Sequence, residues 1–107
     1  IKMHNQRRFF NEDEKWYLNL INETLNLVKQ KDIIIEINYR GIYKQRCTEF
    51  YPSYTILKMM KNKKIRICIS SDAHQPFENG LLHPEALEFA KSAGYKETYC
   101  LNNAISI

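Results

Sequence analysis

The chain has 107 residues, which gives room for one modest domain that buries a smaller share of its surface than a typical enzyme does. Hydrophobic residues make up 44% of the sequence and charged residues 26%, so the composition is that of a globular protein and excludes a disordered or fibrous chain. No apolar run approaches the roughly 20 residues of a membrane span, and we expect a cytoplasmic protein without a secretion leader or a membrane partner.

Positive charge is in slight excess, with a formal net charge of +4. The basic residues are scattered, and the densest run comprises Lys58, Lys61, Lys63, Lys64 and Arg66. A lysine-rich stretch at the end of a helix is typical of a solvated face that complements the helix dipole, so we expect no nucleic-acid partner. The cysteines are three in number and far apart, which favours reduced thiols over a disulfide framework or a structural zinc site.

The first half of the chain predicts a strand, a helix and a second strand. Residues 1–3 resemble the tail of a strand, and Asn11 with Glu14 three residues later has the form of a capping box. Apolar residues then recur at helical spacing, which predicts a helix from about 12 to 30; they are Trp16, Leu20, Ile21, Leu25 and Val28. The β-branched run within 32–38 predicts a buried parallel strand.

The second half continues the alternation of strands and helices. Residues 39–52 lack periodicity and predict a long loop, and Ser53 is placed to cap a helix that ends near Lys61. Alternating isoleucines predict a strand at 65–69, and after a loop at 72–80 a helix begins near Pro84 and is capped by Gly94. A last strand is expected at 98–101. This order predicts a single α/β domain, residues 1–107, built from parallel β-α repeats whose four strands do not close a barrel.

Two residues after the 65–69 strand carry the strongest chemical signal. Asp72 and His74 follow an apolar strand, where reactive side chains of α/β proteins gather. Alternate residues of an extended segment share a face, so a carboxylate and an imidazole at this spacing can bind one metal ion. The alternative is an ordinary loop in which Asp72 starts a turn and His74 is exposed.

A second polar group follows the 32–38 strand. Glu36 and Asn38 share one face of that strand, and a glutamate among isoleucines requires a polar partner. One interpretation is a salt bridge from Glu36 to Arg40, Lys44 or Arg46. The other is that these cations bind a phosphate group, for which the planar guanidinium of arginine is best suited.

Three segments together resemble the closing section of the PHP-family histidinol-phosphate phosphatases. They are the run from Glu36 to Lys44, the Tyr51-Pro52-Ser53 segment and the Ser70-Ser71-Asp72-Ala73-His74 motif, and 90–95 followed by a strand also fits. The resemblance covers essentially the whole chain as the C-terminal section of a distorted (β/α)7 barrel. The N-terminal His-x-His motif and further ligands of the family have no counterpart here, and His4 falls a few residues past the place of the family's third-motif histidine.

The resemblance implies a rim that holds about two or three divalent ions, zinc, manganese or iron. By resemblance, Asp72 and His74 are metal ligands and catalytic residues, Arg40 and Lys44 bind the substrate phosphate, and Glu36 with Asn38 supports the site. The implied activity is hydrolysis of L-histidinol phosphate, a small phosphate ester, to histidinol and phosphate in histidine biosynthesis.

Two alternatives to that activity stay open at this point. One is another phosphoester substrate, such as a nucleotide, on the same fold. The other is a non-catalytic fragment that assembles with a second chain. If the chain belongs to an enzyme with either substrate, we expect it to be inactive by itself. It would then need the missing N-terminal half of the barrel or a further copy of itself.

Overall fold

The structure is a computed structural model, and residues 10–107 are described below. The predicted strand end at 1–3 and His4 lie outside the described residues. The elements follow one another in the order α1 (Lys15–Gln30), β1 (Ile35–Asn38), α2 (Arg40–Tyr43), α3 (Tyr54–Asn62), β2 (Ile67–Ser70), the 3-10 turn η1 (Pro76–Glu78), α4 (His83–Ser92), β3 (Glu97–Cys100) and β4 (Asn103–Ser106). The protein is therefore a small mixed α/β domain, as the sequence predicts.

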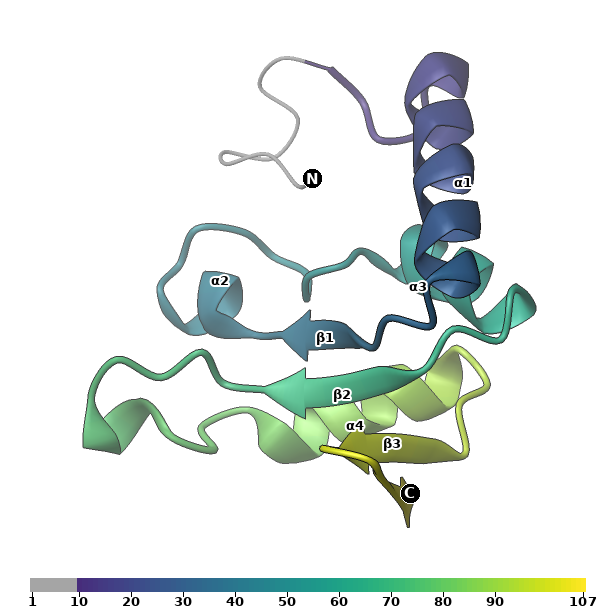
Figure 1. The fold of residues 1–107 in the computed structure, drawn as a ribbon. Helices are drawn as coiled ribbons and strands as arrows, with labels where there is room; N and C mark the ends of the chain where they lie inside the picture. Colours follow the sequence, from purple (N-terminus) through teal and green to yellow (C-terminus); the bar gives the residue numbers. More distant parts are fainter. Residues whose placement is uncertain (1–9) are drawn as a thin grey trace.

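Four short strands form two separate ladders within the described residues (Figure 1). Strands β1 and β2 run parallel, with Ile37 opposite Ile69 and Asn38 opposite Ser70, which confirms the predicted parallel pair. Strand β3 lies beside β2 but pairs in an antiparallel hairpin with β4. The expectation of parallel strands throughout is wrong for β3, the strand predicted at 98–101, which pairs antiparallel with β4. A two-residue turn reverses the chain between them, and Leu101 takes a φ of 54° there.

Helix α1 begins at Lys15, three residues later than predicted. Half of the predicted capping box is present, since the Asn11 N–H donates to Oε1 of Glu14 at 3.1 Å. Tyr17 and Leu25 form the buried face of the helix. Trp16 and Leu20, which the spacing places on the same apolar stripe, are 53% and 52% exposed. Only part of the apolar stripe that the spacing indicates is therefore buried in the core.

The core lies between the β1–β2 pair and the helices around it. Ile37 and Ile67 at the centre of that pair are fully buried, α3 contributes Leu57 and Met60, and α4 contributes Ala90. Small alanines along α4 let its backbone approach β2 closely, as Figure 1 shows. Within residues 10–107, no helix combines the length and the apolarity that crossing a bilayer would need.

The segment 39–52 is more ordered than the predicted loop. It contains α2, and its return path pairs with β1, since Asn38 and Tyr51 exchange two main-chain hydrogen bonds of 2.8 and 2.9 Å. Gly41 in α2 is buried, and a Cβ atom there would lie 2.6 Å from Sγ of Cys47 and 2.7 Å from the Tyr51 ring. The close approach of these side chains requires glycine at this point.

Helix α3 ends in a left-handed residue. Ser53 occupies the predicted cap position, but its hydroxyl makes no cap hydrogen bond. At the other end, Lys64 has a φ of 57°, and the Ile65 N–H donates to the Met60 carbonyl at 3.0 Å. This pattern usually carries glycine at the left-handed position, and here a lysine occupies it.

Candidate functional site

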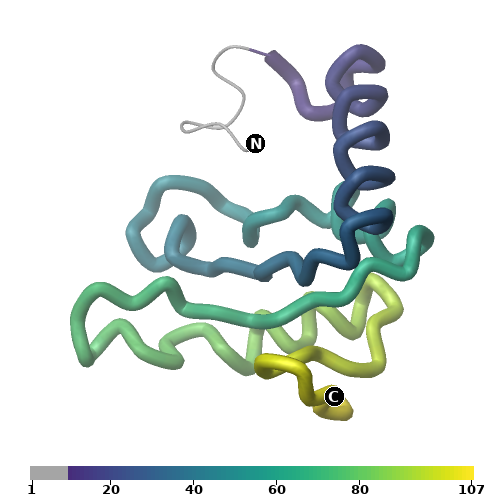
Figure 2. The backbone as a smooth tube through the Cα atoms, viewed as in Figure 1, coloured from purple at the N-terminus to yellow at the C-terminus, as the bar shows by residue number. Residues whose placement is uncertain are grey.

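The two parallel strands end at the same edge and send their following segments out side by side (Figure 2). Strand β1 leads through Tyr39 into α2, and β2 leads into the segment 71–78. Because Asn38 and Ser70 are partners in the ladder, residues shortly after each can contact one another. This edge brings together most of the site residues that the sequence predicts.

A buried carboxylate connects the two segments. Glu78, at the end of η1, is only 1% exposed. Its Oε2 accepts from Nη1 of Arg40 at 2.9 Å and from the His74 N–H at 2.8 Å, and Oε1 forms an ion pair with Nζ of Lys44. One carboxylate thus joins α2, the residue after it and the segment that carries His74.

The charge state of Glu78 follows from these partners. The hydrogen bond from Lys44, then that from the His74 main chain, lowers the pKa of Glu78 from 4.5 to about 2, although burial opposes the shift. Glu78 is therefore ionised at neutral pH and balances the charges of Arg40 and Lys44. A buried carboxylate with cationic partners on both oxygens is a structural anchor for the loop.

Asp72 takes part in this network through its main chain. Its carbonyl oxygen accepts from Nη1 of Arg40 at 2.8 Å and lies 2.8 Å from Nδ1 of His74. Asp72 has a φ of 50°, so the chain is not extended there, and strand alternation does not place the side chains of Asp72 and His74 on one face. The side chains of Asp72 and His74 are exposed.

The contact between His74 and Asp72 defines the state of the imidazole. A carbonyl oxygen only accepts hydrogen bonds, so Nδ1 of His74 must carry the proton in this contact. In a neutral ring, Nε2 is then the nitrogen with a free lone pair. A histidine whose other ring nitrogen donates to a main-chain carbonyl is the usual arrangement of a metal ligand.

The structure gives Glu36 a different partner from the salt bridge that the sequence suggests. Glu36 is exposed, and its Oε1 accepts from Nδ2 of Asn38 at 2.6 Å rather than from a cation of the following segment. Oδ1 of Asn38 accepts from the Arg40 N–H at 2.8 Å and so fixes the start of α2. The predicted salt bridge from Glu36 to Arg40 or Lys44 is absent because both cations pair with Glu78.

Part of the bonding capacity of Arg40 and Lys44 is therefore used within the protein, in their contacts with Glu78. Among residues 10–107, the side-chain hydrogen bonds of Arg40 all use Nη1, which contacts the Asp72 carbonyl, Glu78 and the Tyr43 hydroxyl. The Nη2 and Nε donors of Arg40 have no partner within that part of the chain. A ligand can therefore contact Arg40 without breaking its bonds to Glu78 and Asp72.

Two residues of this network, Glu78 and Tyr43, are missed by sequence reasoning. The Tyr43 hydroxyl donates to the Ser71 carbonyl at 2.8 Å and ties α2 to the residue before Asp72. Neither residue stands in a motif. The available signal was the group of cations after β1, which needs a counter-charge somewhere in the fold, but the sequence does not say which acid supplies it.

We expect Tyr43→Phe to destabilise the fold by about 1 kcal/mol, because the half-buried Ser71 carbonyl loses its donor. Urea unfolding followed by circular dichroism measures this change. Tyr54→Phe is the matched control, since the exposed Tyr54 hydroxyl donates to the Ser92 carbonyl at 3.1 Å and water can replace it. Equal losses in the two variants would contradict a tying role for Tyr43.

The described residues do not complete a metal site by themselves. Within residues 10–107, no group of three or more histidine, cysteine, aspartate or glutamate side chains is arranged to hold an ion. No protein-family model matches the chain, and no curated protein matches it. The candidate site therefore rests on the geometry of Asp72, His74 and their anchors.

Proposed function

We propose that this chain supplies one side of the active site of a metal-dependent phosphomonoesterase, similar in kind to the PHP histidinol-phosphate phosphatases. The observation that carries the proposal is the placement of two potential ligands, Asp72 and His74, beside two cations, Arg40 and Lys44, at the carboxyl edge of a parallel strand pair. In α/β folds this edge is where substrates bind.

The donor set suits a divalent ion. Asp72 offers an exposed carboxylate, and His74 offers Nε2 while its Nδ1 is held by a carbonyl. A bound ion of this class lowers the pKa of a coordinated water and neutralises charge on phosphoryl oxygens. Two ligands do not hold a catalytic ion tightly, so the proposal requires further ligands from outside residues 10–107.

The cations have a separate role in the proposal. Arg40 is fixed by Glu78 and the Asp72 carbonyl, and in the proposal its remaining donors bind the phosphate group. Lys44 adds positive charge beside it. The same carboxylate that holds both residues also holds the His74 main chain, so the proposed phosphate-binding cations lie beside the segment that carries the proposed metal ligands.

The proposed substrate is L-histidinol phosphate, and the proposed cofactors are zinc, manganese or iron. Phosphate release from this ester, measured with the protein that contains the complete set of ligands, tests the assignment. We expect Asp72→Asn and His74→Ala each to lower kcat at least about a hundredfold. A parallel panel of nucleotides tests whether a different phosphoester is preferred.

Matched controls separate chemistry from folding. Asp13→Asn changes an exposed aspartate ahead of α1, and His83→Ala changes the exposed histidine that begins α4 and has no side-chain contact with Asp72, His74, Arg40 or Lys44 within residues 10–107; both should retain activity. Manganese binding by calorimetry should weaken in the Asp72 and His74 variants and not in the controls. Activity at the unaltered level in both Asp72→Asn and His74→Ala would refute the proposed function.

A further inference from the structure

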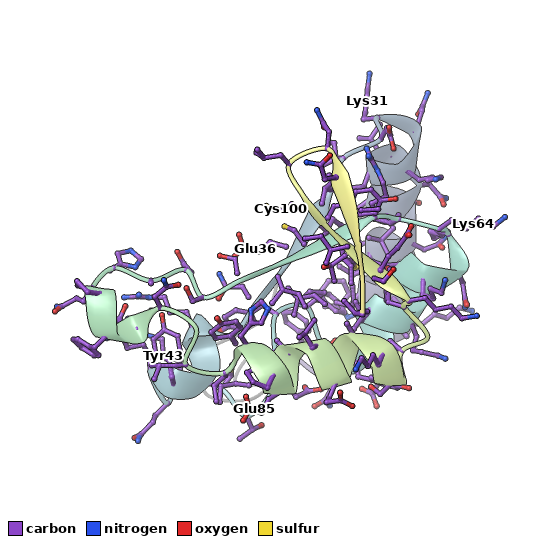
Figure 3. All side chains as sticks on the ribbon, turned by 90° about the horizontal axis from the view of Figure 1, so that it is seen from below. Lys31, Glu36, Tyr43, Lys64, Glu85 and Cys100 are labelled. Carbon is purple, nitrogen blue, oxygen red and sulfur yellow. The ribbon has the colours of Figure 1, made fainter. Side chains whose placement is uncertain are left out.

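A second cluster of cations lies at the opposite end of the strands. The connections α3–β2 and α4–β3 run side by side there (Figure 2), and between them is a hollow of about 340 Å³. Its walls include four cationic side chains, those of Lys61, Lys64, Arg66 and Lys96. Figure 3 shows Lys64 at the far end of the molecule from Tyr43, so this hollow is separate from the site described above.

The positive charge of the hollow is largely unbalanced. Arg66 pairs with Asp32 at 2.9 Å, but Lys61, Lys64 and Lys96 form no ion pair within residues 10–107. The wall also carries a carboxylate, that of Glu97, which accepts a hydrogen bond from the Tyr99 hydroxyl at 3.0 Å. A further ammonium approaches from α1, since Nζ of Lys29 donates to the Lys64 carbonyl at 2.9 Å. Like charges gathered around one hollow repel one another unless an anion lies among them.

Two of the cations are held in place by aromatic rings. Nζ of Lys61 lies 5.4 Å from the centre of the Tyr95 ring, and the Arg66 guanidinium lies 5.1 Å from that of Tyr99. The Tyr95 hydroxyl donates to the Ile65 carbonyl at 3.0 Å, which fixes the ring itself. Cations held in this way lose little freedom when a ligand binds.

Arg66 also has bonding capacity that the fold does not use. Its Nε is buried and has no hydrogen-bond partner within the described chain, although its Nη2 donates to Asp32. Buried donors are nearly always paired in folded proteins, and an unpaired one calls for an explanation. Because Arg66 lines the hollow, an anion bound there would offer such an acceptor.

We propose that this hollow is a binding site for a small anion that carries two or more phosphate groups. Three unpaired lysines match an anion with several charges better than a single phosphate, and the volume is that of a small-molecule site. The lysines come from the end of α3, from the α3–β2 connection and from the α4–β3 connection, an arrangement that suits a compact ligand better than the open track that a nucleic-acid strand follows. The site requires no metal and no turnover, so it stands or fails independently of the proposed function.

The test uses Lys64→Gly, because this change separates binding from folding. Glycine suits the φ of 57° at position 64, so the variant should be at least as stable as the unaltered chain while it lacks one lining charge. Titration calorimetry of the full chain with sodium tripolyphosphate, at about 50 mM salt, should show binding that Lys64→Gly weakens about fivefold. Lys61→Gln and Lys96→Gln should each weaken it similarly, and the triple variant should abolish it.

Lys58→Gln is the matched control, since Lys58 is exposed on α3 and does not line the hollow. We expect it to leave tripolyphosphate affinity within about twofold of the unaltered chain, as salt screens a charge outside the hollow. Amide shifts on binding should fall on 61–67 and 95–99. Equal weakening by Lys58→Gln and Lys64→Gly would overturn the proposal, as would binding of a single-stranded oligonucleotide by a chain that does not bind tripolyphosphate.

Discussion

We expect Glu78→Gln to lower the Tm at neutral pH by on the order of 10 °C. The neutral amide of the glutamine leaves Arg40 and Lys44 without a counter-charge. Its NH₂ group is also a donor, and it would face the donor Nζ of Lys44. It also weakens the acceptor for the His74 N–H. Thermal unfolding followed by circular dichroism measures the loss. Glu88→Gln is the control, because Glu88 pairs with Lys91 at 3.0 Å on the surface and its removal should shift Tm by less than about 2 °C.

The same variant gives a pH test of the anchor. The pKa of Glu78 is about 2 in the fold against 4.5 for an unperturbed glutamate, so the native state favours the ionised form. Its contribution to stability is fully present above pH 4.5 and is lost as the pH falls through about 2. Glutamine does not titrate. The difference in Tm between the unaltered chain and Glu78→Gln should therefore shrink as the pH falls from 4.5 to about 2. A difference of constant size down to pH 2 would contradict the lowered pKa.

The second large effect is expected at Gly41. Gly41→Ala should destabilise the fold by about 3 kcal/mol, because the new Cβ would meet Sγ of Cys47 at 2.6 Å and the Tyr51 ring at 2.7 Å. The damage should extend to the site, since α2 carries Arg40 and Tyr43 to their partners in the segment 71–78. Urea unfolding gives the change in free energy.

Gly80 provides the comparison, because the two glycines are required for different reasons. Gly80 has a φ of 75°, and a Cβ atom added there would meet no atom of residues 10–107 within 4 Å, so this glycine supplies conformational freedom and not space. Asparagine tolerates a left-handed conformation, and Gly80→Asn should cost less than about 1 kcal/mol. Gly41→Asn should instead be worse than Gly41→Ala. Similar costs for the two asparagine variants would show that space at Gly41 is not the limiting factor.

Long elements with a clear period could be predicted from the sequence. The helices near 12–30, 53–61 and 84–93 appear as α1, α3 and α4, because each carries several apolar residues at helical spacing. Helix α2 was missed because four residues around Gly41 give no period, and only tertiary contacts show why the chain turns there. Strand β4 was missed because its residues are exposed and do not alternate, and because Leu101 at the turn is a poor residue for a positive φ.

The candidate site was predictable only in part, for a related reason. The position of Asp72 and His74 after a strand is a local fact, and the sequence contains it. The partner of Arg40 and Lys44 is not local, because Glu78 lies 38 residues after Arg40 and reaches it only through the parallel pairing of β1 and β2. Glu36, which is closer in the chain, was the wrong choice because strand alternation turns it outward to Asn38.

The pairing of Asn38 with Tyr51 limits how the sheet can grow. Ile35 donates its N–H toward β2, so alternation turns the peptide groups of Glu36 and Asn38 toward the other side of β1. The main-chain N–H and C=O of Asn38 already form hydrogen bonds with Tyr51 on that side. A further strand along this side would therefore find the main chain of Asn38 already paired, next to the rim that carries Arg40.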